Sequence, residues 1–383
     1  MTHSLQFEAI AFPEACAPLR EEVRAFLAKE LSTGTLADRA PDAGAFSREF
    51  SKRLGEMGWL GMMWPKKYGG HERSALERYV VNEELLVAGA PTGAHFVADR
   101  QSGPLLLRFG TEEQRERILP GMTRGETSFC IGMSEPNSGS DLASVQTSAK
   151  QVDGGWMLNG TKLWTSWAHK AQYMITLART SPRGENKHEG LTQLMVELSS
   201  SGIEVRPIVN LKGLHDFNEV VLTDCFVPDD MVVGNVGNGW HQVTSELAYE
   251  RSGPERFLSM FRLVVEMLRA IGPDPTPHQA QVIGRLVSHF VTLRNMSISV
   301  AGMLQAGKLP NLEAALVKDL GTTFEQEIPE IARLLIDAEP SATSDRPFEL
   351  ALAQALLHAP QVSIQGGTRE ILRVVIARGM GLQ

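Results

Sequence analysis

The stretch from Gly132 to Asp141, GMSEPNSGSD, combines small turn-forming residues with serine hydroxyls and carboxylates. Such residues let a backbone approach another molecule closely, and their N–H groups and hydroxyls can donate hydrogen bonds to it. A Trp-rich segment, LNGTKLWTSWA, follows this loop in the sequence. Loop and segment together could form one wall of a flat, polar-edged pocket. The alternatives are a surface turn for the loop and ordinary sheet packing for Trp164 and Trp167.

A second candidate for chemistry is the carboxylate of Glu250 in SELAYERSGPERF. At about 100° per residue, Glu250 falls roughly 40° from the centre of an apolar helical stripe. The stripe consists of Trp240, Val243, Leu247, Pro254, Leu258 and Phe261. Desolvation raises the pKa of a carboxyl group toward working pH, which suits a general base. The alternatives are an ion pair with Arg251 or Arg256, or a glutamate at the edge of the stripe that reaches water.

A third candidate lies near the end of the chain, where Gly366 and Gly367 precede Thr368. Thr368 is predicted to be the N-cap of a last helix, and Gly379 is predicted to be its C-cap. N–H groups at a helix N-terminus suit a phosphate or the polar edge of a ligand.

Hydrophobic periodicity divides the chain into three regions that would position these residues. Residues 1–125 are predicted to form a helical domain, with capping boxes at Ser74–Glu77 and Thr111–Gln114. Residues 126–235 show the short alternating segments of an antiparallel β-domain, and Asn159-Gly160 is a hairpin turn signal within it. Residues 236–383 return to the period of long bundle helices.

Composition excludes several classes of function. Hydrophobic residues make up 43% and charged residues 21% of the 383 residues, which is ordinary for a globular core. The net charge of −8 and the absence of a Lys/Arg run argue against nucleic-acid and membrane-surface binding. Three scattered cysteines, Cys16, Cys130 and Cys225, predict a reducing compartment and no metal site. Without a signal-peptide pattern or a membrane-length apolar run, we expect a cytoplasmic protein.

Several stretches, taken in order, resemble the acyl-CoA dehydrogenase family. They are GWLGMMWPKKYGG, LLRFGTEEQRERILPGMTRGE, GMSEPNSGSDLASVQTSA, WMLNGTKLWTSWA, LHDFNEVVLTDCFVPDDMVVG, NVGNGW and GGTREILRVVIARGMGL. The resemblance implies an α+β multidomain fold, with an N-terminal helical domain, a middle antiparallel β-domain and a C-terminal four-helix bundle. It also implies FAD held between the β-domain and the bundle. The sequence has no strand-linked GxGxxG, so a Rossmann site is not supported.

The resemblance also assigns site residues. It implies FAD contacts by Ile131, Met133, Ser134, Ser140, Trp164, Thr165, Ser166, Thr368, Arg369 and Glu370. Met133 and Ser134 would face the flavin ring, and Ser140 would lie near both the pyrophosphate and the pantetheine arm of the substrate. Trp164 to Ser166 would lie on the hairpin strand that covers the other edge of the flavin. Arg251 and Gly367 would also contact the substrate.

The catalytic base departs from the commonest family pattern. Many family members place a Glu directly before the Gly-Thr of the C-terminal motif, where this chain has Gly366. Other members carry the base on a bundle helix, at the position that matches Glu250. The resemblance therefore implies oxidation of an acyl-CoA to a 2,3-enoyl-CoA, with Glu250 removing the α-proton. It further implies electron-transfer flavoprotein as the acceptor and a homo-oligomer, either a dimer or a tetramer.

Two departures keep other functions open. The family's Arg-x-x-Phe-Gly turn is absent, and RAIGPDPTPHQ occupies its place. The Gln-x-x-Gly-Gly stretch is not recognisable near IARLLIDAEP. Both motifs bind FAD across subunits in the family. The alternatives are a low-activity or structural subunit of a hetero-oligomer with a related chain, and a flavin oxidase or monooxygenase of the same fold.

Overall fold

The computed structural model describes residues 5–32 and 44–382, apart from the side chains of residues 246–250. The chain packs into two compact units. The sheet unit comprises residues 44–73 and 92–247, and the bundle unit comprises residues 1–43, 74–91 and 248–383. The domain boundaries predicted after residues 125 and 235 remain predictions.

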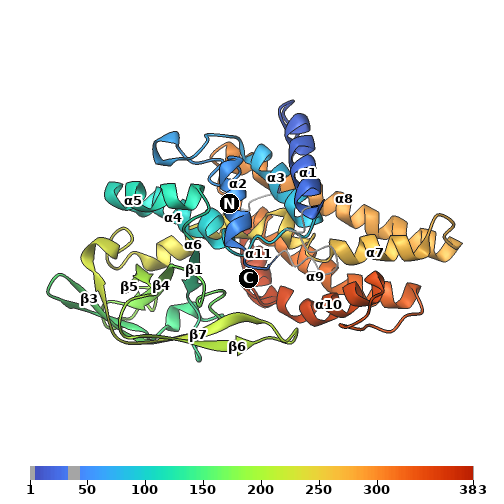
Figure 1. Ribbon diagram of the computed structural model, residues 1–383. Helices are drawn as coiled ribbons and strands as arrows, with labels where there is room; N and C mark the ends of the chain where they lie inside the picture. Colours follow the sequence, from blue (N-terminus) through green and yellow to red (C-terminus); the bar gives the residue numbers. More distant parts are fainter. Residues whose placement is uncertain (1–4, 33–43, 383) are drawn as a thin grey trace. The chain divides into compact units, whose positions relative to one another are not determined.

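The sheet unit is built on a seven-stranded mixed sheet (Figure 1). The strands run in the order β1-β4-β2-β3-β7-β6, and β5 pairs with β4. The pairs β2–β3, β3–β7, β4–β5 and β6–β7 are antiparallel, as the alternating pattern predicts, whereas β1 and β2 pair with β4 in parallel. The strands are β1 (Phe129–Gly132), β2 (Ser148–Val152), β3 (Gly155–Lys162), β4 (Tyr173–Arg179), β5 (Leu191–Glu197), β6 (Ile203–Val209) and β7 (His215–Pro228).

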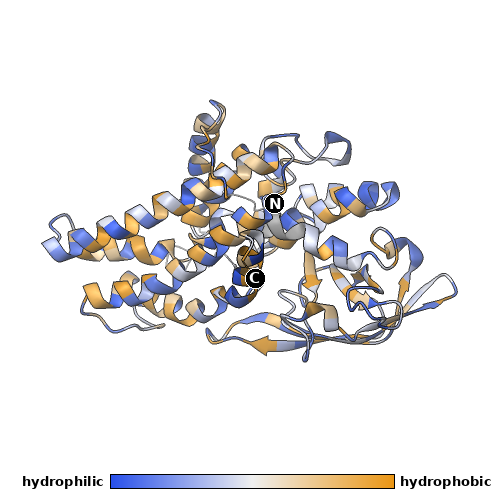
Figure 2. Ribbon diagram, turned by 180° about the vertical axis from the view of Figure 1, so that it is seen from behind, coloured by the Kyte–Doolittle hydropathy of each residue, from blue (hydrophilic) through white to orange (hydrophobic). Residues whose placement is uncertain are grey.

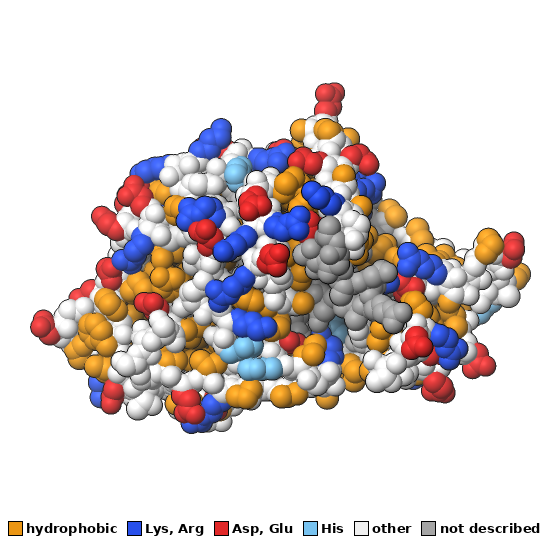
Figure 3. Space-filling model, viewed as in Figure 1, with side chains coloured by type: hydrophobic (Ala, Val, Ile, Leu, Met, Phe, Trp, Pro, Cys, Tyr) orange, Lys and Arg blue, Asp and Glu red, His pale blue; other side chains and the backbone are white. Residues whose placement is uncertain are grey.

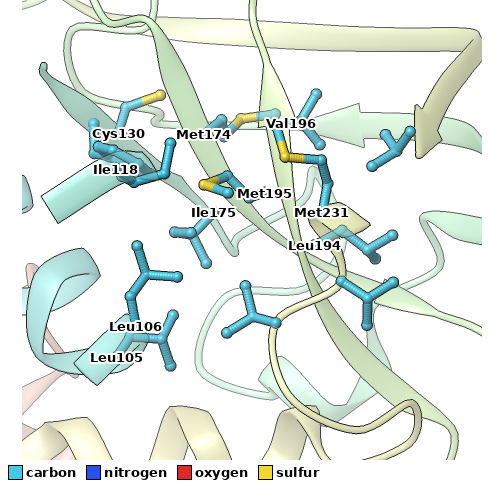
Figure 4. Packing of buried hydrophobic residues seen from close by; sticks show 14 of the residues in the cluster. Leu105, Leu106, Ile118, Cys130, Met174, Ile175, Leu194, Met195, Val196 and Met231 are labelled. Atoms are coloured by element: carbon cyan, nitrogen blue, oxygen red, sulfur yellow. The ribbon is translucent and has the colours of Figure 1, made fainter. Parts of the chain in front are cut away.

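Helices of the same unit pack their apolar side chains against the sheet. Figure 4 shows Leu105, Leu106 and Ile118 from the helices beside Ile175 and Met195 from the strands. The helices of the sheet unit are α2 (Arg48–Glu56), α4 (Gly103–Phe109), α5 (Glu112–Thr123) and most of α6 (Gly239–Arg251), with short turns η1 (Lys66–Tyr68), η2 (Ala98–Ser102), η3 (Leu142–Ser144) and η4 (Asp229–Met231). This shared core fixes the strand ends from which the candidate loop emerges.

The bundle unit is helical, as the returning helical period predicts. Figure 2 shows both hydrophilic and hydrophobic residues along its helices, as expected of helices that bury one face. Phe257, Phe324 and Leu352 belong to its buried core. The elements are α1 (Cys16–Ser32), α3 (Ala75–Val87), η5 (Pro254–Arg256), α7 (Phe261–Ile271), α8 (Pro277–Gln305), α9 (Asn311–Leu335), α10 (Pro347–Val362) and α11 (Arg369–Gly379).

Helix starts follow the predicted capping chemistry. Ser74 and Glu77 form a complete capping box at the start of α3, and Thr111 and Gln114 form one at the start of α5. The Thr368 hydroxyl accepts a hydrogen bond from the N–H of Ile371 at the start of α11, so the predicted N-cap is confirmed. Gly379 is instead the last helical residue, and Met380 takes the C-cap position.

The predicted hairpin turn at Asn159-Gly160 is wrong. The β2–β3 hairpin turns at Asp153-Gly154, and β3 continues through Asn159 and Gly160. A bulge between Leu158 and Gly160 shifts the register against β7 there. Gly160 serves a close approach, because a Cβ on it would lie 2.4 Å from the Thr147 hydroxyl oxygen.

Charges of both signs are interspersed over the face drawn in Figure 3. Among the described residues, no helix is both long enough and apolar enough to cross a membrane.

Candidate active site

A buried ion pair holds the loop that follows β1. The Nζ of Lys162, on β3, lies 2.8 Å from a carboxylate oxygen of Glu135, and the side chains are 0% and 7% exposed. The Glu135 carboxylate also accepts the N–H groups of Gln146 at 2.6 Å and Thr147 at 2.9 Å. Lys162 donates further to the carbonyls of Met133 and Leu177. Lys162 thus ties the loop to β3 through Met133 and Glu135.

The pair works as a unit because each partner offsets the cost of burying the other. Burial lowers the pKa of Lys162 to about 8, although the charge of Glu135 opposes this. Burial alone would raise the pKa of Glu135, but Lys162 and the two backbone donors leave it below its ordinary value. The pair fixes the backbone of Met133 and Glu135, which lie on either side of Ser134.

The structure brings the loop and the Trp-rich segment together. The N–H of Leu163 donates to the carbonyl of Ser134 at 2.9 Å. Trp164 to Ser166 were expected on a hairpin strand, but β3 ends at Lys162 and these residues lie in the irregular turn after it. The expected adjacency of loop and segment is therefore present, with a different local conformation.

The segment has an unusual backbone and incompletely bonded polar groups. Trp164 and Trp167 have positive φ values of 61° and 59°, a strained conformation for non-glycine residues. The Trp164 side chain is 57% exposed, whereas Thr165 is fully buried. The Thr165 hydroxyl is buried with no hydrogen-bond partner among the described residues. Within that same part of the chain, the Ser166 N–H also has no acceptor.

The other predicted contacts of the sheet unit differ in exposure. Ile131 lies in β1 opposite Ile175, and both Ile131 and Met133 pack partly buried against the core. Ser134 is half-buried, and Ser140 is exposed.

In the bundle unit, a buried lysine holds the Gly366–Gly367 turn. Lys318, on α9, is 1% exposed, and its Nζ donates to the carbonyls of Gln365 and Gly367 at 2.5 Å each. Gly366 and Gly367 have φ values of 65° and 94°, which favour glycine. A carbonyl and the following N–H point in opposite directions across a trans peptide. The N–H groups of Gly366 and Thr368 are therefore directed away from Lys318.

Arg251 and Gly367, the two predicted substrate contacts of this unit, lie side by side. A Cβ on Gly367 would stand 3.1 Å from an Nη atom of Arg251, so a larger residue at this position would crowd the guanidinium. Arg251 is 5% exposed and is the last residue of α6, which ends three residues before Pro254. The predicted apolar stripe through Pro254, Leu258 and Phe261 is therefore wrong, because these three residues lie beyond the end of the helix. Glu250 lies in this last turn, and its side chain lies outside the described part of the structure.

The start of α11 carries the remaining predicted contacts. Arg369 lies 3.4 Å from Asp319 of α9, which anchors the first turn of the helix. Glu370 is exposed, and its own N–H and the Thr368 hydroxyl hold its pKa below the ordinary value.

A second buried carboxylate lies deeper in the bundle. Glu325, on α9, is 2% exposed, and one of its oxygens accepts the N–H of Ser259 at 2.7 Å and its hydroxyl at 2.5 Å. Burial raises the pKa of Glu325 to about 7, against the effect of the Ser259 bonds and of Arg256. This group joins α9 to the chain that follows η5.

Sequence reasoning missed Glu135, Lys162 and Lys318. A signal existed for Lys162, because side chains alternate along a strand and Trp156, Leu158 and Lys162 share one face of β3. The partners of Lys318 lie about fifty residues further along the chain, and the pattern around it carries no sign of them.

Comparison with known proteins agrees with these features. The model of the acyl-CoA dehydrogenase N-terminal domain matches residues 13–126, and that of the acyl-CoA dehydrogenase middle domain matches residues 130–225. Acyl-CoA dehydrogenase IpdE1 of Mycobacterium tuberculosis is 33% identical over 379 residues, covering 95% of this chain and 97% of the relative. The chain belongs to the acyl-CoA dehydrogenase family. It is thus an enzyme of the oxidoreductase class that acts on CH–CH groups.

Other members of the acyl-CoA dehydrogenase family extend the comparison. FadE34 of M. tuberculosis is 34% identical over 331 residues, and this chain spans 45% of its length. The solved structure described as the Tcur3481-Tcur3483 steroid ACAD matches with a TM-score of 0.86 and 28% identity, covering 97% of this chain and 99% of that one. The ChsE4-ChsE5 complex from M. tuberculosis matches with a TM-score of 0.84 and 27% identity, covering 98% and 99%.

Proposed function

We propose that the chain catalyses FAD-dependent α,β-dehydrogenation of an acyl-CoA thioester to a 2,3-enoyl-CoA, with Glu250 as the base. One observation carries the assignment of the base. The Arg251 guanidinium lies beside Gly367, so the residue next to Glu250 in the chain reaches the Gly366–Gly367 turn within the bundle unit. A carboxylate on α6 would then act as the base that Gly366, which has no side chain, cannot provide.

In the proposed reaction, the Glu250 carboxylate removes the proton from the α-carbon while the β-carbon loses a hydride and the C=C bond forms. Desolvation at the end of α6 would raise the pKa of the carboxylate toward working pH. Arg251 and the N–H groups of the Gly366–Gly367 turn would bind and orient the polar parts of the substrate. Lys318 would hold that turn in place through the two carbonyls that it binds.

The residues present fit FAD as the hydride acceptor. Among the described residues, the buried Thr165 hydroxyl and the Ser166 N–H have no hydrogen-bond partner. The exposed Trp164 indole offers an apolar surface beside them. Ile131, Met133, Ser134, Ser140, Trp164, Thr165 and Ser166 would hold the cofactor in the sheet unit. When bound, FAD supplies the two-electron acceptor that this chemistry requires.

We further propose that the chain works in an oligomer and passes its electrons to an electron-transfer flavoprotein. Two of the structural relatives are described as pairs of different chains, Tcur3481-Tcur3483 and ChsE4-ChsE5. This chain lacks both family motifs that bind FAD across subunits, and α7 and α8 are joined by a short Pro-rich connection where one of them would lie. A hetero-oligomer with a related chain is therefore the second candidate assembly.

The test is to purify the chain alone and together with a related dehydrogenase chain, and to record flavin absorbance after adding FAD. A panel of straight-chain, branched and steroid side-chain acyl-CoA thioesters is then added without oxygen. We expect loss of the oxidised flavin absorbance and a product two hydrogen atoms lighter by mass spectrometry. Folded protein that takes up no FAD in either preparation would refute the proposal, and a product formed only with oxygen consumption would identify an oxidase.

A further inference from the structure

A buried asparagine on β7 connects the Trp164–Ser166 segment to a pair of histidines within the sheet unit. Asn218 is fully buried, and its side-chain Nδ2 donates to the carbonyl of Thr165 at 2.9 Å. Its own backbone carbonyl accepts the N–H of Thr165 at 3.0 Å. One residue therefore binds both backbone polar groups of Thr165.

The Thr165 carbonyl sets the orientation of the Asn218 amide, and two histidines bind the amide oxygen. Its Oδ1 lies 3.1 Å from Nδ1 of His169 and 2.7 Å from Nε2 of His215. Because an amide oxygen can only accept, both ring nitrogens carry the hydrogen. The rings stack with centroids 3.8 Å apart and planes 16° from parallel. A flipped amide would point its oxygen at the Thr165 carbonyl oxygen, which can only accept, so only one orientation is stable.

The two hydrogen bonds from Asn218 to Thr165 hold a strained part of the backbone. Trp164 and Trp167, on either side of Thr165 and Ser166, both have left-handed φ values. Such residues persist only where the surroundings over-determine them. The N–H of Trp167 is held by the carbonyl of Asp216, and Thr165 is held by Asn218. Since the Thr165 carbonyl faces Asn218, the N–H of Ser166 must point the opposite way across the planar peptide.

We propose that Asn218, whose amide oxygen binds His169 and His215, is a positioning residue that fixes the Trp164–Ser166 backbone for cofactor binding. The inference rests on the proposed function, because that function makes this segment a flavin contact. Asn218 itself does not touch the reacting atoms. It directs the Ser166 N–H to the side opposite β7 and keeps it free to bind a ligand.

The experiment compares Asn218→Ala, Asn218→Asp and the control Asn159→Ala with the wild-type chain. Asn218→Asp keeps an acceptor for both histidines but cannot donate to the Thr165 carbonyl. Asn159 is the control, since its side chain joins β3 to β7, with bonds of 3.0 and 2.9 Å to Asp224, but does not bind the segment. FAD affinity and the shape of the visible flavin bands are measured by titration. Amide hydrogen exchange of residues 163–168 is measured without FAD.

We expect both Asn218 variants to bind FAD about tenfold more weakly, as ~1.4 kcal/mol implies, and to exchange faster over residues 163–168. The FAD affinity and the exchange rate of Asn159→Ala should stay within about twofold of the wild-type values. Thermal melting establishes that each variant folds. Wild-type affinity and exchange in Asn218→Asp would overturn the inference, because the donor to Thr165 would then be unnecessary. Wild-type protein that binds no FAD would instead refute the proposed function, while the exchange result would still decide whether Asn218 holds the segment.

Discussion

Replacing the buried Glu325 by Gln should make the stability of the protein less dependent on pH. Burial raises the pKa of Glu325 from 4.5 to about 7, so the folded state prefers the neutral carboxyl. Its contribution to stability is fully present below pH 4.5 and is lost as the pH rises to about 7. A glutamine side chain at this position would be neutral throughout, and its amide oxygen could still accept the two bonds from Ser259.

The size of the effect follows from the two pKa values. At 1.36 kcal/mol for each pH unit, the interval from 4.5 to about 7 corresponds to about 3 kcal/mol. Between pH 5 and pH 8, the free energy of unfolding of the Glu325→Gln variant should therefore rise by roughly 2 to 3 kcal/mol relative to that of the wild type. Urea denaturation at half-unit steps of pH measures this difference directly.

The control is Glu330→Gln on the same helix, where the side chain is exposed and pairs with Arg333 at 2.8 Å. The free energy of unfolding of this variant should depend on pH as that of the wild type does, because the charge of Glu330 stays in water. A constant difference between Glu325→Gln and wild type across pH 5 to 8 would show that Glu325 ionises in the folded state as it does in the unfolded chain. That result would refute the argument from burial.

Three further substitutions test the loop, the turn and the flavin contact. Lys162→Met should lower the free energy of unfolding by about 3–5 kcal/mol, because it leaves Glu135 buried without a cation, and adding Glu135→Leu should restore part of that loss. If urea denaturation finds the single variant as stable as the wild type, this prediction is contradicted. Lys318→Met should weaken acyl-CoA binding and speed amide exchange of residues 365–368, whereas the exposed-site variant Lys308→Met should do neither. Equal exchange rates in the two variants would show that Lys318 does not hold the Gly366–Gly367 turn. Ser134→Ala should weaken FAD binding by about 1 kcal/mol or shift the flavin spectrum modestly, since it removes one hydrogen bond, and an unchanged titration and spectrum would exclude that bond.

Local signals in the sequence predicted much of the fold. Capping boxes at Ser74 and Thr111 mark helix starts because their hydrogen bonds join residues three apart, which a sequence displays directly. The periodicity of the bundle helices likewise reflects a face that must be buried. The Asn159-Gly160 dipeptide misled because its turn preference is local. Pairing with β7 outweighs that preference and keeps the dipeptide within β3, beside a bulge.

The site was less predictable than the fold because its supporting contacts are long-range. The resemblance named Ser134 and Thr165, but the residues that hold them did not stand out. Lys162 binds a glutamate 27 positions earlier, and Asn218 binds a carbonyl 53 positions earlier. Such pairs follow from strand order and register, which periodicity alone does not specify. The conformation of the Trp164–Ser166 turn depends on these partners and was therefore assigned wrongly to a strand.

The base at Glu250 is the central claim, and anaerobic reduction of the bound flavin by a good acyl-CoA substrate tests it most directly. Glu250→Gln should keep the fold and FAD but slow flavin reduction by about 10²–10⁴-fold, the usual contribution of a general base. Adding Gly366→Glu to that variant should restore part of the rate, although the φ of 65° at this position disfavours a side chain. Reduction of the Glu250→Gln variant at the wild-type rate would contradict the account and place the base elsewhere.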